Sequence, residues 1–352
     1  MNVLVVGGTG FVGTHLCREL AGRGHHVTAL SRDPDEADLP PEVERVAGDT
    51  TAYDSIEGAF EGQDAVVFLV ALSPLFKPKG GYERHSDVHL GGTENAVRAA
   101  KEHGVEKYVQ MSALGADPNA DTAYIRSKGQ ADRVVKDSGL DWTIFQPSVI
   151  FGEGDEFVGF TKLLAPPYFT PLPGGGKSKF QPIWIGDIVE MFAMAVEGTV
   201  PEDEDDEDGE AESEEEGSAE ETTEGEDAES ETEGGDAESE SGSGSTDPHV
   251  GQTYEICGPD VLTLAEVARL AHAAEGKPVN VYSVPMSLAG VGLKLLDNVP
   301  GAPMGGDQYR SLQFDNVTTD NAVGVFGFDE GDLTTLAAYL GVSPEAAKPG
   351  RA

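Results

Sequence analysis

The sequence predicts an α/β fold, with a doubly wound parallel sheet and a small C-terminal lobe. Two observations carry this prediction. Strand-like and helix-like segments alternate through the first half of the chain, and a glycine-rich turn follows the first strand-like segment. Alternation of this kind is typical of parallel strands joined by right-handed crossover helices.

Short apolar runs are predicted as strands at 3–6, 26–30, 43–47, 65–70, 107–111 and 142–146. Helical patterns fall between them, at 11–23, 53–60, 84–103 and 122–138. The second half is interrupted by prolines and glycines, with strands expected near 179–184 and 252–257 and helices at 188–197, 264–274 and 333–340. Gly186 and Asp187 are expected to cap the helix at 188–197.

The turn after the first predicted strand reads GGTGFVG, residues 7–13, and it opens a helical pattern. In this context Gly7 permits a tight turn, Gly10 lets the backbone approach a pyrophosphate, and Gly13 lets the helix pack closely on the strand. The helix N-terminus would offer N–H groups to the phosphates. The pattern predicts a Rossmann-type dinucleotide-binding domain, and the alternative is a tight turn that binds nothing.

The choice of dinucleotide is decided at the end of the second strand. An acidic residue there would bind the ribose hydroxyls of NAD, whereas an arginine would accept the 2′-phosphate of NADP. Ser31 and Arg32 occupy this position and favour NADP(H) over NAD(H), although Asp33 could still bind a ribose hydroxyl. Asp49 follows the third strand, where it either reaches the adenine amine or serves only the turn.

A second group of residues suggests hydride-transfer chemistry. Tyr124 and Lys128 are four residues apart in a helical pattern, so their side chains share one face. An ammonium beside a phenol lowers the pKa of the phenol, which would let Tyr124 exchange a proton near neutral pH. Ser112 follows the strand at 107–111, and its hydroxyl could polarise a substrate carbonyl. The alternative for Tyr124 and Lys128 is an exposed helical pair.

These residues resemble the short-chain dehydrogenase/reductase superfamily, in its extended or atypical branch. The runs FQPSVIFG at 145–152 and PIWIGDI at 182–188 are similar to later elements of that branch, and the likeness covers most of the chain except an acidic tract. The runs SALGA at 112–116 and LQFDNV at 312–317 resemble a subgroup that contains the nucleotide-binding accessory subunit of respiratory complex I. Gln146 departs from the branch, which usually has arginine there.

The resemblance implies roles for individual residues. Tyr124 would be the acid/base, Lys128 its partner and ribose ligand, and Ser112 the residue that orients the carbonyl. Contacts with the nucleotide are expected from Gly7, Gly10, Phe11, Val12, Gly13, Ser31, Arg32, Asp49, Lys128 and Pro147.

Two functions follow from these observations, and both stay open at this point. One is an NADP(H)-dependent oxidoreductase, or an epimerase-type enzyme, acting on a small carbonyl or alcohol. The other is a non-catalytic nucleotide-binding accessory or assembly subunit of an NADH:quinone oxidoreductase. The Ser112, Tyr124 and Lys128 set favours the enzyme, whereas the tail at 312–317 favours the subunit.

The domain organisation follows from composition. We expect one NAD(P)-binding domain over 1–200 and 248–345, with a substrate lobe at about 150–185 and 258–330. The tract at 201–247 holds 24 acidic residues and no Lys, Arg or aromatic residue. It cannot bury enough apolar surface to offset its ordering entropy, so we expect a disordered loop insertion. It would act as a solubilising tether or as an acidic docking arm for a basic partner.

The whole chain is strongly acidic, with 64 acidic and 23 basic residues and a formal net charge of −41. Without the tract, 40 acidic residues still face 23 basic ones, a net charge of −17. This excess favours a protein adapted to molar salt over an ordinary acidic protein, and it argues against nucleic acid and anionic membranes as partners.

The remaining features are expected to be structural. Cys17 and Cys257 are interpreted as small core residues, and no transmembrane segment or signal peptide is expected. We therefore expect a cytoplasmic protein, which would reach a membrane only through a partner such as a respiratory complex. His85 and His89 have the spacing of metal ligands without an evident third ligand, so no metal is predicted and they are interpreted as a helical surface pair. The apolar run at 286–296 either packs on the lobe or docks a partner.

Overall fold

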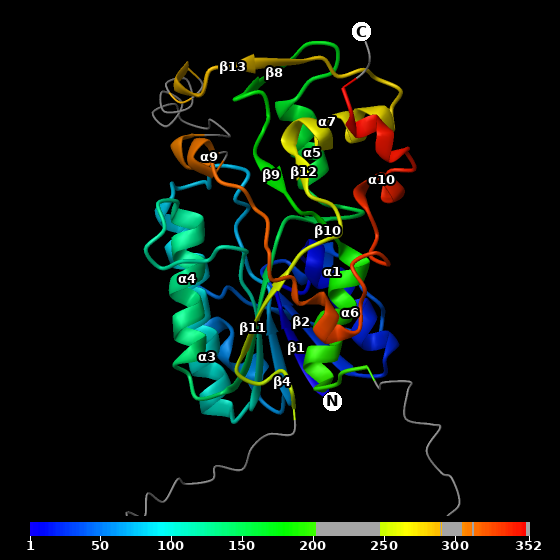
Figure 1. The fold of residues 1–352 in the computed structure, drawn as a ribbon. Coiled ribbons are helices and arrows are strands. Elements are labelled where there is room, and N and C mark those ends of the chain that lie inside the picture. The colour runs from blue at the N-terminus through cyan, green and yellow to red at the C-terminus, as the bar shows by residue number, and fades with distance from the viewer. Residues whose placement is uncertain (202–246, 289, 291–304, 312, 350–352) are drawn as a thin grey trace, which may run out of the picture. The chain divides into compact units, whose positions relative to one another are not determined.

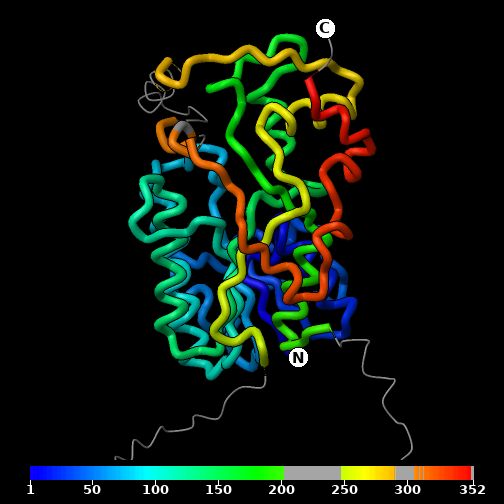
Figure 2. Tube along the Cα trace, viewed as in Figure 1, coloured from blue at the N-terminus to red at the C-terminus, as the bar shows by residue number. Residues whose placement is uncertain are grey.

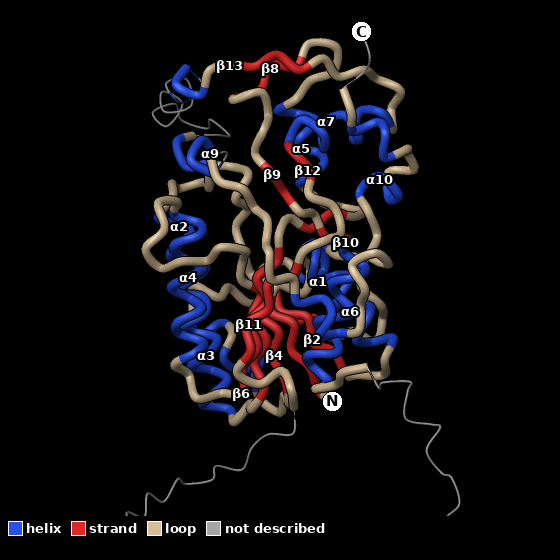
Figure 3. Tube along the Cα trace, viewed as in Figure 1, coloured by secondary structure: helices blue, strands red, loops and turns tan. Residues whose placement is uncertain are grey.

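The computed structural model describes residues 1–201, 247–288, 290, 305–311 and 313–349. Seven parallel strands form its central sheet, in the order β11-β6-β5-β4-β1-β2-β3 (Figures 1 and 3). The strand order reverses between β1 and β4, which is where doubly wound folds bind ligands. The predicted fold class is confirmed. The strands are β1 (Asn2–Val6), β2 (His26–Ser31), β3 (Glu44–Ala47), β4 (Ala65–Phe68), β5 (Lys107–Met111), β6 (Asp141–Pro147) and β11 (Gln252–Ile256).

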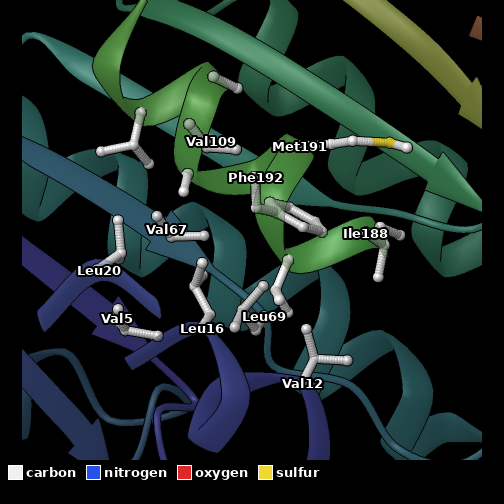
Figure 4. Close-up of a cluster of buried hydrophobic side chains, with 14 of the residues drawn as sticks. Val5, Val12, Leu16, Leu20, Val67, Leu69, Val109, Ile188, Met191 and Phe192 are labelled. Carbon is white, nitrogen blue, oxygen red and sulfur yellow. The ribbon is translucent and has the colours of Figure 1, made fainter. Parts of the chain in front are cut away.

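Helices cover both faces of the sheet, as Figure 1 shows: α1 (Phe11–Gly22) and α6 (Ile185–Glu197) on one face, α3 (Gly92–His103) and α4 (Ala123–Lys136) on the other. The alternation along β1 separates two cores, because Val3 and Val5 pack toward α1 and α6 while Leu4 and Val6 pack toward α3. Figure 4 shows the first of these cores. Strands buried on both faces are apolar throughout, which explains the continuous apolar runs in the sequence.

Two expected helices take a different form. The helix at 84–103 begins as the short α2 (Glu83–His85), passes through a π-helical stretch, Ser86–Gly91, and continues as α3. The expected helix at 53–60 is a pair of 3-10 turns, Tyr53–Ser55 and Glu57–Phe60. His85 and His89, four residues apart across the junction of α2 and the π-helical stretch, still bring their rings together, with centroids 5.2 Å apart.

Where the structure describes it, the C-terminal lobe contains three two-stranded sheets and short helices. The pairs are β7 (Ile150–Phe151) with β10 (Ile183–Trp184), β8 (Thr170–Pro173) with β13 (Val281–Val284), and β9 (Lys179–Phe180) with β12 (Leu262–Thr263). The helices are α5 (Phe157–Leu164), α7 (Leu264–Ala273), α9 (Gly306–Ser311) and α10 (Leu336–Tyr339). Thr263 and Glu266 form a reciprocal capping box that fixes the start of α7.

The tail of the chain packs against both the central sheet and the C-terminal lobe. Val323, Phe326 and Leu333 pack with the core beneath α6, whereas Leu336 and Ala337 pack with α7 in the lobe. The expected cap at Asp187 is corrected: α6 begins at Ile185, and the Asp187 carboxylate accepts the N–H of Thr334 (2.9 Å) instead.

The two flanks of the acidic tract lie together at the end of the sheet (Figure 2). Lys107 Nζ donates to the carbonyls of Ala195 (3.2 Å) and Val196 (2.8 Å) and forms an ion pair with Asp247. Apart from its two end residues, the expected disordered tract at 201–247 lies outside the described residues, as does most of the apolar run at 286–296. Cys17 and Cys257 are buried thiols, and no helix within the described ranges has the length and apolar character needed to cross a membrane.

Candidate functional site

The glycine turn joins β1 to the open N-terminus of α1. Gly7 has a φ of +92°, and its N–H donates to the Leu30 carbonyl (2.8 Å), which holds the turn against β2. No described side chain caps α1, and its first turn has no acidic residue. The N–H groups at the start of this helix are therefore available to an anion. Val12 is buried beneath the turn, and Phe11 is partly exposed.

Gly10 and Gly13 differ in what surrounds them. A Cβ atom on Gly13 would lie 2.2 Å from the Gly7 carbonyl oxygen, so the contact between helix and turn requires glycine. A Cβ atom on exposed Gly10 would meet only that same oxygen, at 3.3 Å. The protein itself hardly constrains Gly10, and its lack of a side chain leaves room for a ligand.

A cationic cavity lies at the end of β2. Its volume is about 470 Å³, and four of its eight lining residues are Lys or Arg in a chain with net charge −41. Apart from Arg32, the lining residues come from one segment, residues 72–84, which we call the cationic loop. The guanidinium of exposed Arg32 forms no hydrogen bond or ion pair within the described ranges, and the buried hydroxyl oxygen of Ser31 likewise lacks a partner there. The lining residues are Arg32, Leu72, Ser73, Phe76, Lys77, Pro78, Lys79 and Arg84.

The cationic loop was not identified from the sequence. A signal was present, because Lys77, Lys79 and Arg84 cluster within a few residues in a chain that has only 23 basic residues. Arg84 forms an ion pair with Asp87 (3.1 Å), and Lys77 lies over the ring of Tyr82.

Asp49 serves the turn after β3. Its Oδ1 accepts the backbone N–H (2.9 Å) and the hydroxyl (2.8 Å) of Thr51. The backbone hydrogen bond, the hydroxyl and the positive charges of Arg32 and Arg84 lower the pKa of this carboxyl. Asp49 therefore has the turn role that the sequence left open, and its contact with adenine stays a prediction.

The end of β5 and the helix α4 bring two predicted residues together. Ser112 is buried directly after β5, and its N–H donates to the Phe145 carbonyl (2.7 Å). Lys128 on α4 donates from Nζ to the Met111 carbonyl (2.8 Å), the residue before Ser112. Burial lowers the pKa of Lys128 to about 8, and the negative charge of Asp132 opposes this shift. Buried Pro147 ends β6, and its carbonyl accepts the N–H of Leu114 (2.9 Å).

Tyr124 lies one helical turn before Lys128 on α4, and the coupling between their protonation states stays a prediction. Lys128 directs its ammonium to the Met111 carbonyl. Burial raises the pKa of the Tyr124 phenol above its ordinary value, which favours the neutral phenol.

Two buried histidines surround the Tyr124 ring. His85 and His89 are each 1% exposed, and their ring centroids lie 5.6 and 5.3 Å from that of Tyr124, both edge-on. Their rings share one helix face, with centroids 5.2 Å apart, but that face packs against Tyr124 and is buried, so they are not the helical surface pair that the sequence spacing suggested. No group of three or more His, Cys, Asp or Glu side chains that could hold a metal ion occurs among the residues placed by the structure.

The hydrogen bonds of His89 fix its tautomer. The Leu72 N–H donates to Nε2 (2.9 Å), so this nitrogen is unprotonated. Nδ1 therefore carries the proton and donates to Ser127 Oγ (2.8 Å), whose hydroxyl donates to the Tyr124 carbonyl (2.8 Å). Burial accordingly lowers the pKa of His89. The neutral imidazole links the cationic loop to the helix that carries Tyr124.

The residues after 304 complete this region. The Asp307 carboxylate on α9 accepts the N–H of Ala123 at the start of α4 (2.8 Å), and the Gln308 amide donates to the Pro74 carbonyl (3.2 Å). The tail of the chain thus covers both the cationic loop and the start of α4. No local pattern in the sequence indicates such a contact, since it joins residues more than 180 positions apart.

Comparison with known proteins agrees with this geometry. A protein-family model described as NAD(P)H-binding matches residues 7–160. A 3-diazoavenalumate denitrifying reductase from a Streptomyces species is 30% identical over 223 residues, covering 56% of this chain and 72% of that protein. The chain belongs to the NAD(P)-binding Rossmann family. The resemblance seen in the sequence is thereby confirmed at the level of the family.

Two further likenesses bear on the alternatives. The mitochondrial NADH dehydrogenase [ubiquinone] 1 alpha subcomplex subunit 9 of Arabidopsis thaliana is 24% identical over 339 residues, covering 91% of this chain and 71% of that protein. The crystal structure of an NADPH-dependent quinone oxidoreductase from Escherichia coli superposes with a TM-score of 0.62 at 17% identity, covering 96% of this chain and 98% of the other. The second likeness is one of fold.

Proposed function

We propose that the protein is an NADP(H)-dependent oxidoreductase that interconverts a small carbonyl compound and its alcohol. One observation carries this proposal: Lys128, one helical turn after Tyr124 on α4, donates from Nζ to the carbonyl of Met111, the residue before Ser112 at the carboxyl end of β5. The uncapped N-terminus of α1 after the glycine turn supports it. Parallel-sheet enzymes of this class bind the dinucleotide across the carboxyl ends of the central strands. The nicotinamide would then lie against these three side chains.

In the reductive direction the dinucleotide, when bound, supplies a hydride to the carbonyl carbon. Tyr124 would give its phenolic proton to the carbonyl oxygen, so that carbonyl, hydride and proton become an alcohol. The tyrosinate would then regain its proton from solvent, with Lys128, one helical turn away on α4, as a neighbouring positive charge. A raised pKa of Tyr124 suits this direction, because the phenol stays protonated until negative charge develops on the substrate oxygen.

The preference for NADP(H) rests on the cationic cavity. A 2′-phosphate is a dianion near neutral pH, and Arg32 with Lys77, Lys79 and Arg84 supplies cations around a cavity at the end of β2. A dinucleotide without this phosphate would lack the anionic group that these cations can bind.

The test uses 9,10-phenanthrenequinone as a general carbonyl probe, in buffer containing molar potassium chloride. We expect NADPH oxidation by the wild-type protein, a kcat/KM lowered about 10²–10⁴-fold in Tyr124→Phe, and equal NADPH affinity for both proteins. Undiminished turnover in Tyr124→Phe would refute the role of Tyr124, and absence of NADPH binding by the wild type would refute the proposal.

A second function is favoured by one comparison and one contact. The complex I subunit from Arabidopsis aligns with 91% of this chain, and the Ser112 hydroxyl is already hydrogen-bonded within the protein. A non-catalytic accessory or assembly subunit would use the bound nucleotide as a structural element. Fractionation of the native protein from cells lysed in molar potassium chloride separates the two: co-purification with a membrane complex that has NADH:quinone activity supports the subunit, and a free protein carrying NADP(H) supports the enzyme.

A further inference from the structure

A buried carboxylate lies directly behind Ser112. Asp132, one helical turn after Lys128 on α4, is 5% exposed. Its Oδ2 accepts the Ser112 hydroxyl (2.8 Å) and the Gln146 side-chain amide (2.9 Å), while its Oδ1 is buried without a partner. A buried acceptor without a partner is destabilising, so a role in stability does not explain this arrangement.

The Ser112 hydroxyl has only one proton to donate, and its present hydrogen bond conflicts with a role in polarising a carbonyl. A serine hydroxyl has one proton to donate, and here it is donated to Asp132. Ser112 can then only accept a hydrogen bond from a substrate. An alcohol substrate can supply one, but a carbonyl oxygen has no proton to give, so Ser112 cannot polarise a carbonyl while the Asp132 carboxylate is ionised.

We propose that Asp132 is a positioning residue that sets the direction of the Ser112 hydrogen bond, an inference that rests on the proposed function. When Asp132 takes up a proton on Oδ2, its O–H donates to Ser112 Oγ, and the Ser112 hydroxyl turns to the substrate carbonyl. When Asp132 is ionised, Ser112 donates to it and presents a lone pair to the substrate. One proton moves onto or off the carboxyl group, and no other bond changes.

The surroundings of Asp132 permit both states. Burial raises the pKa of this carboxyl, while the hydrogen bonds from Ser112 and Gln146 and the charges of Lys128 and Lys136 oppose the shift. Gln146 is the important neighbour, because its neutral amide holds Oδ2 without the full charge that would keep the carboxyl ionised. Lys128 directs its ammonium to the Met111 carbonyl.

Asp132→Asn imitates the protonated state. With its amide nitrogen in the place of Oδ2, one N–H can donate to Ser112 Oγ, so the Ser112 hydroxyl is always free for the substrate. The Gln146 amide, which donates to Oδ2 in the wild type, must then turn so that its carbonyl oxygen accepts the second N–H. We expect the kcat/KM of the wild type for 9,10-phenanthrenequinone with NADPH to fall as pH rises through the pKa of Asp132, by about 100-fold, the usual effect of losing one donor to a developing oxyanion. Asp132→Asn should lack that fall, and Ser112→Ala should be slow at every pH.

Asp132→Asn that keeps the same pH dependence as the wild type, or that is as slow as Ser112→Ala throughout, overturns the proposal. If Asp132 had only a structural role, Asp132→Asn would lower kcat/KM without changing the shape of its pH profile.

A second measurement does not depend on turnover. The 13C carboxyl resonance of Asp132, assigned by its absence in Asp132→Asn, is titrated in the nucleotide-free wild type and in Ser112→Ala. We expect a pKa above the ordinary 3.9 in the wild type and a higher one in Ser112→Ala, which lacks the donor to the carboxylate. A pKa at or below 3.9 in the wild type overturns the proposal. A raised pKa in a protein without turnover supports the behaviour of Asp132, and it is then the proposed function that fails.

Discussion

The two ends of the candidate site differ in how much of their polar chemistry is already engaged. At the dinucleotide end, residues 7–13 with Arg32 and the cationic loop, the N-terminus of α1 is uncapped and Arg32 has no described partner. At the catalytic end, Ser112, Lys128 and His89 each hold a hydrogen bond inside the protein. The first end is ready to bind an anion, whereas the second must exchange a protein contact for each substrate contact. Binding and turnover should therefore respond separately to mutation.

The largest effects are expected at the glycine turn, where the two outcomes can be separated. Gly13→Val places side-chain atoms against the Gly7 carbonyl and should prevent folding, seen as loss of a cooperative thermal transition. Gly10→Val should fold but lose two or more charge-assisted hydrogen bonds to the pyrophosphate, about 10²–10⁴-fold in NADPH affinity. Unchanged affinity in Gly10→Val would show that the dinucleotide does not bind at this turn.

At the catalytic end we expect the converse of Gly10→Val, a loss of turnover without a loss of NADPH affinity. Tyr124→Phe removes the proton donor but no hydrogen bond given by the structure, so we expect kcat/KM to fall about 10²–10⁴-fold with unchanged melting temperature and NADPH affinity. Calorimetry and isothermal titration of the variant provide the control. A parallel loss of affinity would mean that the two ends are not separable at this residue.

The buried histidines should make the catalytic end sensitive to acid. Burial lowers the pKa of His85 from 6.5 to about 4, with the charge of Lys128 acting in the same direction and that of Asp307 against it. Because the unfolded chain binds the proton more readily, the unfolding free energy is complete above pH 6.5 and falls as pH drops toward 4, by about 3 kcal/mol. Chemical denaturation of the wild type and of His85→Leu at several pH values measures this, and an identical pH dependence in the two would contradict it.

A smaller effect on stability is expected at His89, whose hydrogen bonds connect Leu72 of the cationic loop to Ser127 of α4. His89→Leu leaves the Leu72 N–H and the Ser127 hydroxyl without the imidazole, and we expect a loss of about 1–3 kcal/mol in the unfolding free energy. His89→Asn, which can both accept and donate, is the matched control and should lose less. Equal stability of both variants and the wild type would show that this link carries no free energy.

The same comparison explains what the sequence could and could not predict. The glycine turn is a local signal in which strand, turn and helix are contiguous, so residues 7–13 predicted the fold and the phosphate end directly. The catalytic end depends on contacts between distant segments, such as Ser112 with Asp132 and Asp307 with Ala123. His85 and His89 were misplaced on the surface because spacing indicates which side chains share a helix face but not what covers that face, which here is the Tyr124 ring of α4. Spacing alone placed Tyr124 and Lys128 on one helix, but it could not indicate where the ammonium of Lys128 would find its partner.

The most direct test of the account is a comparison of NADPH and NADH dissociation constants by isothermal titration, for the wild type and for a Lys77→Ala/Lys79→Ala variant in the cationic loop. We predict that the wild type binds NADPH more tightly than NADH, and that the variant loses affinity for NADPH while its affinity for NADH is unchanged. Equal affinities for the two dinucleotides in the wild type, or a loss in the variant that is the same for both, would contradict a 2′-phosphate site built from Arg32 and the cationic loop.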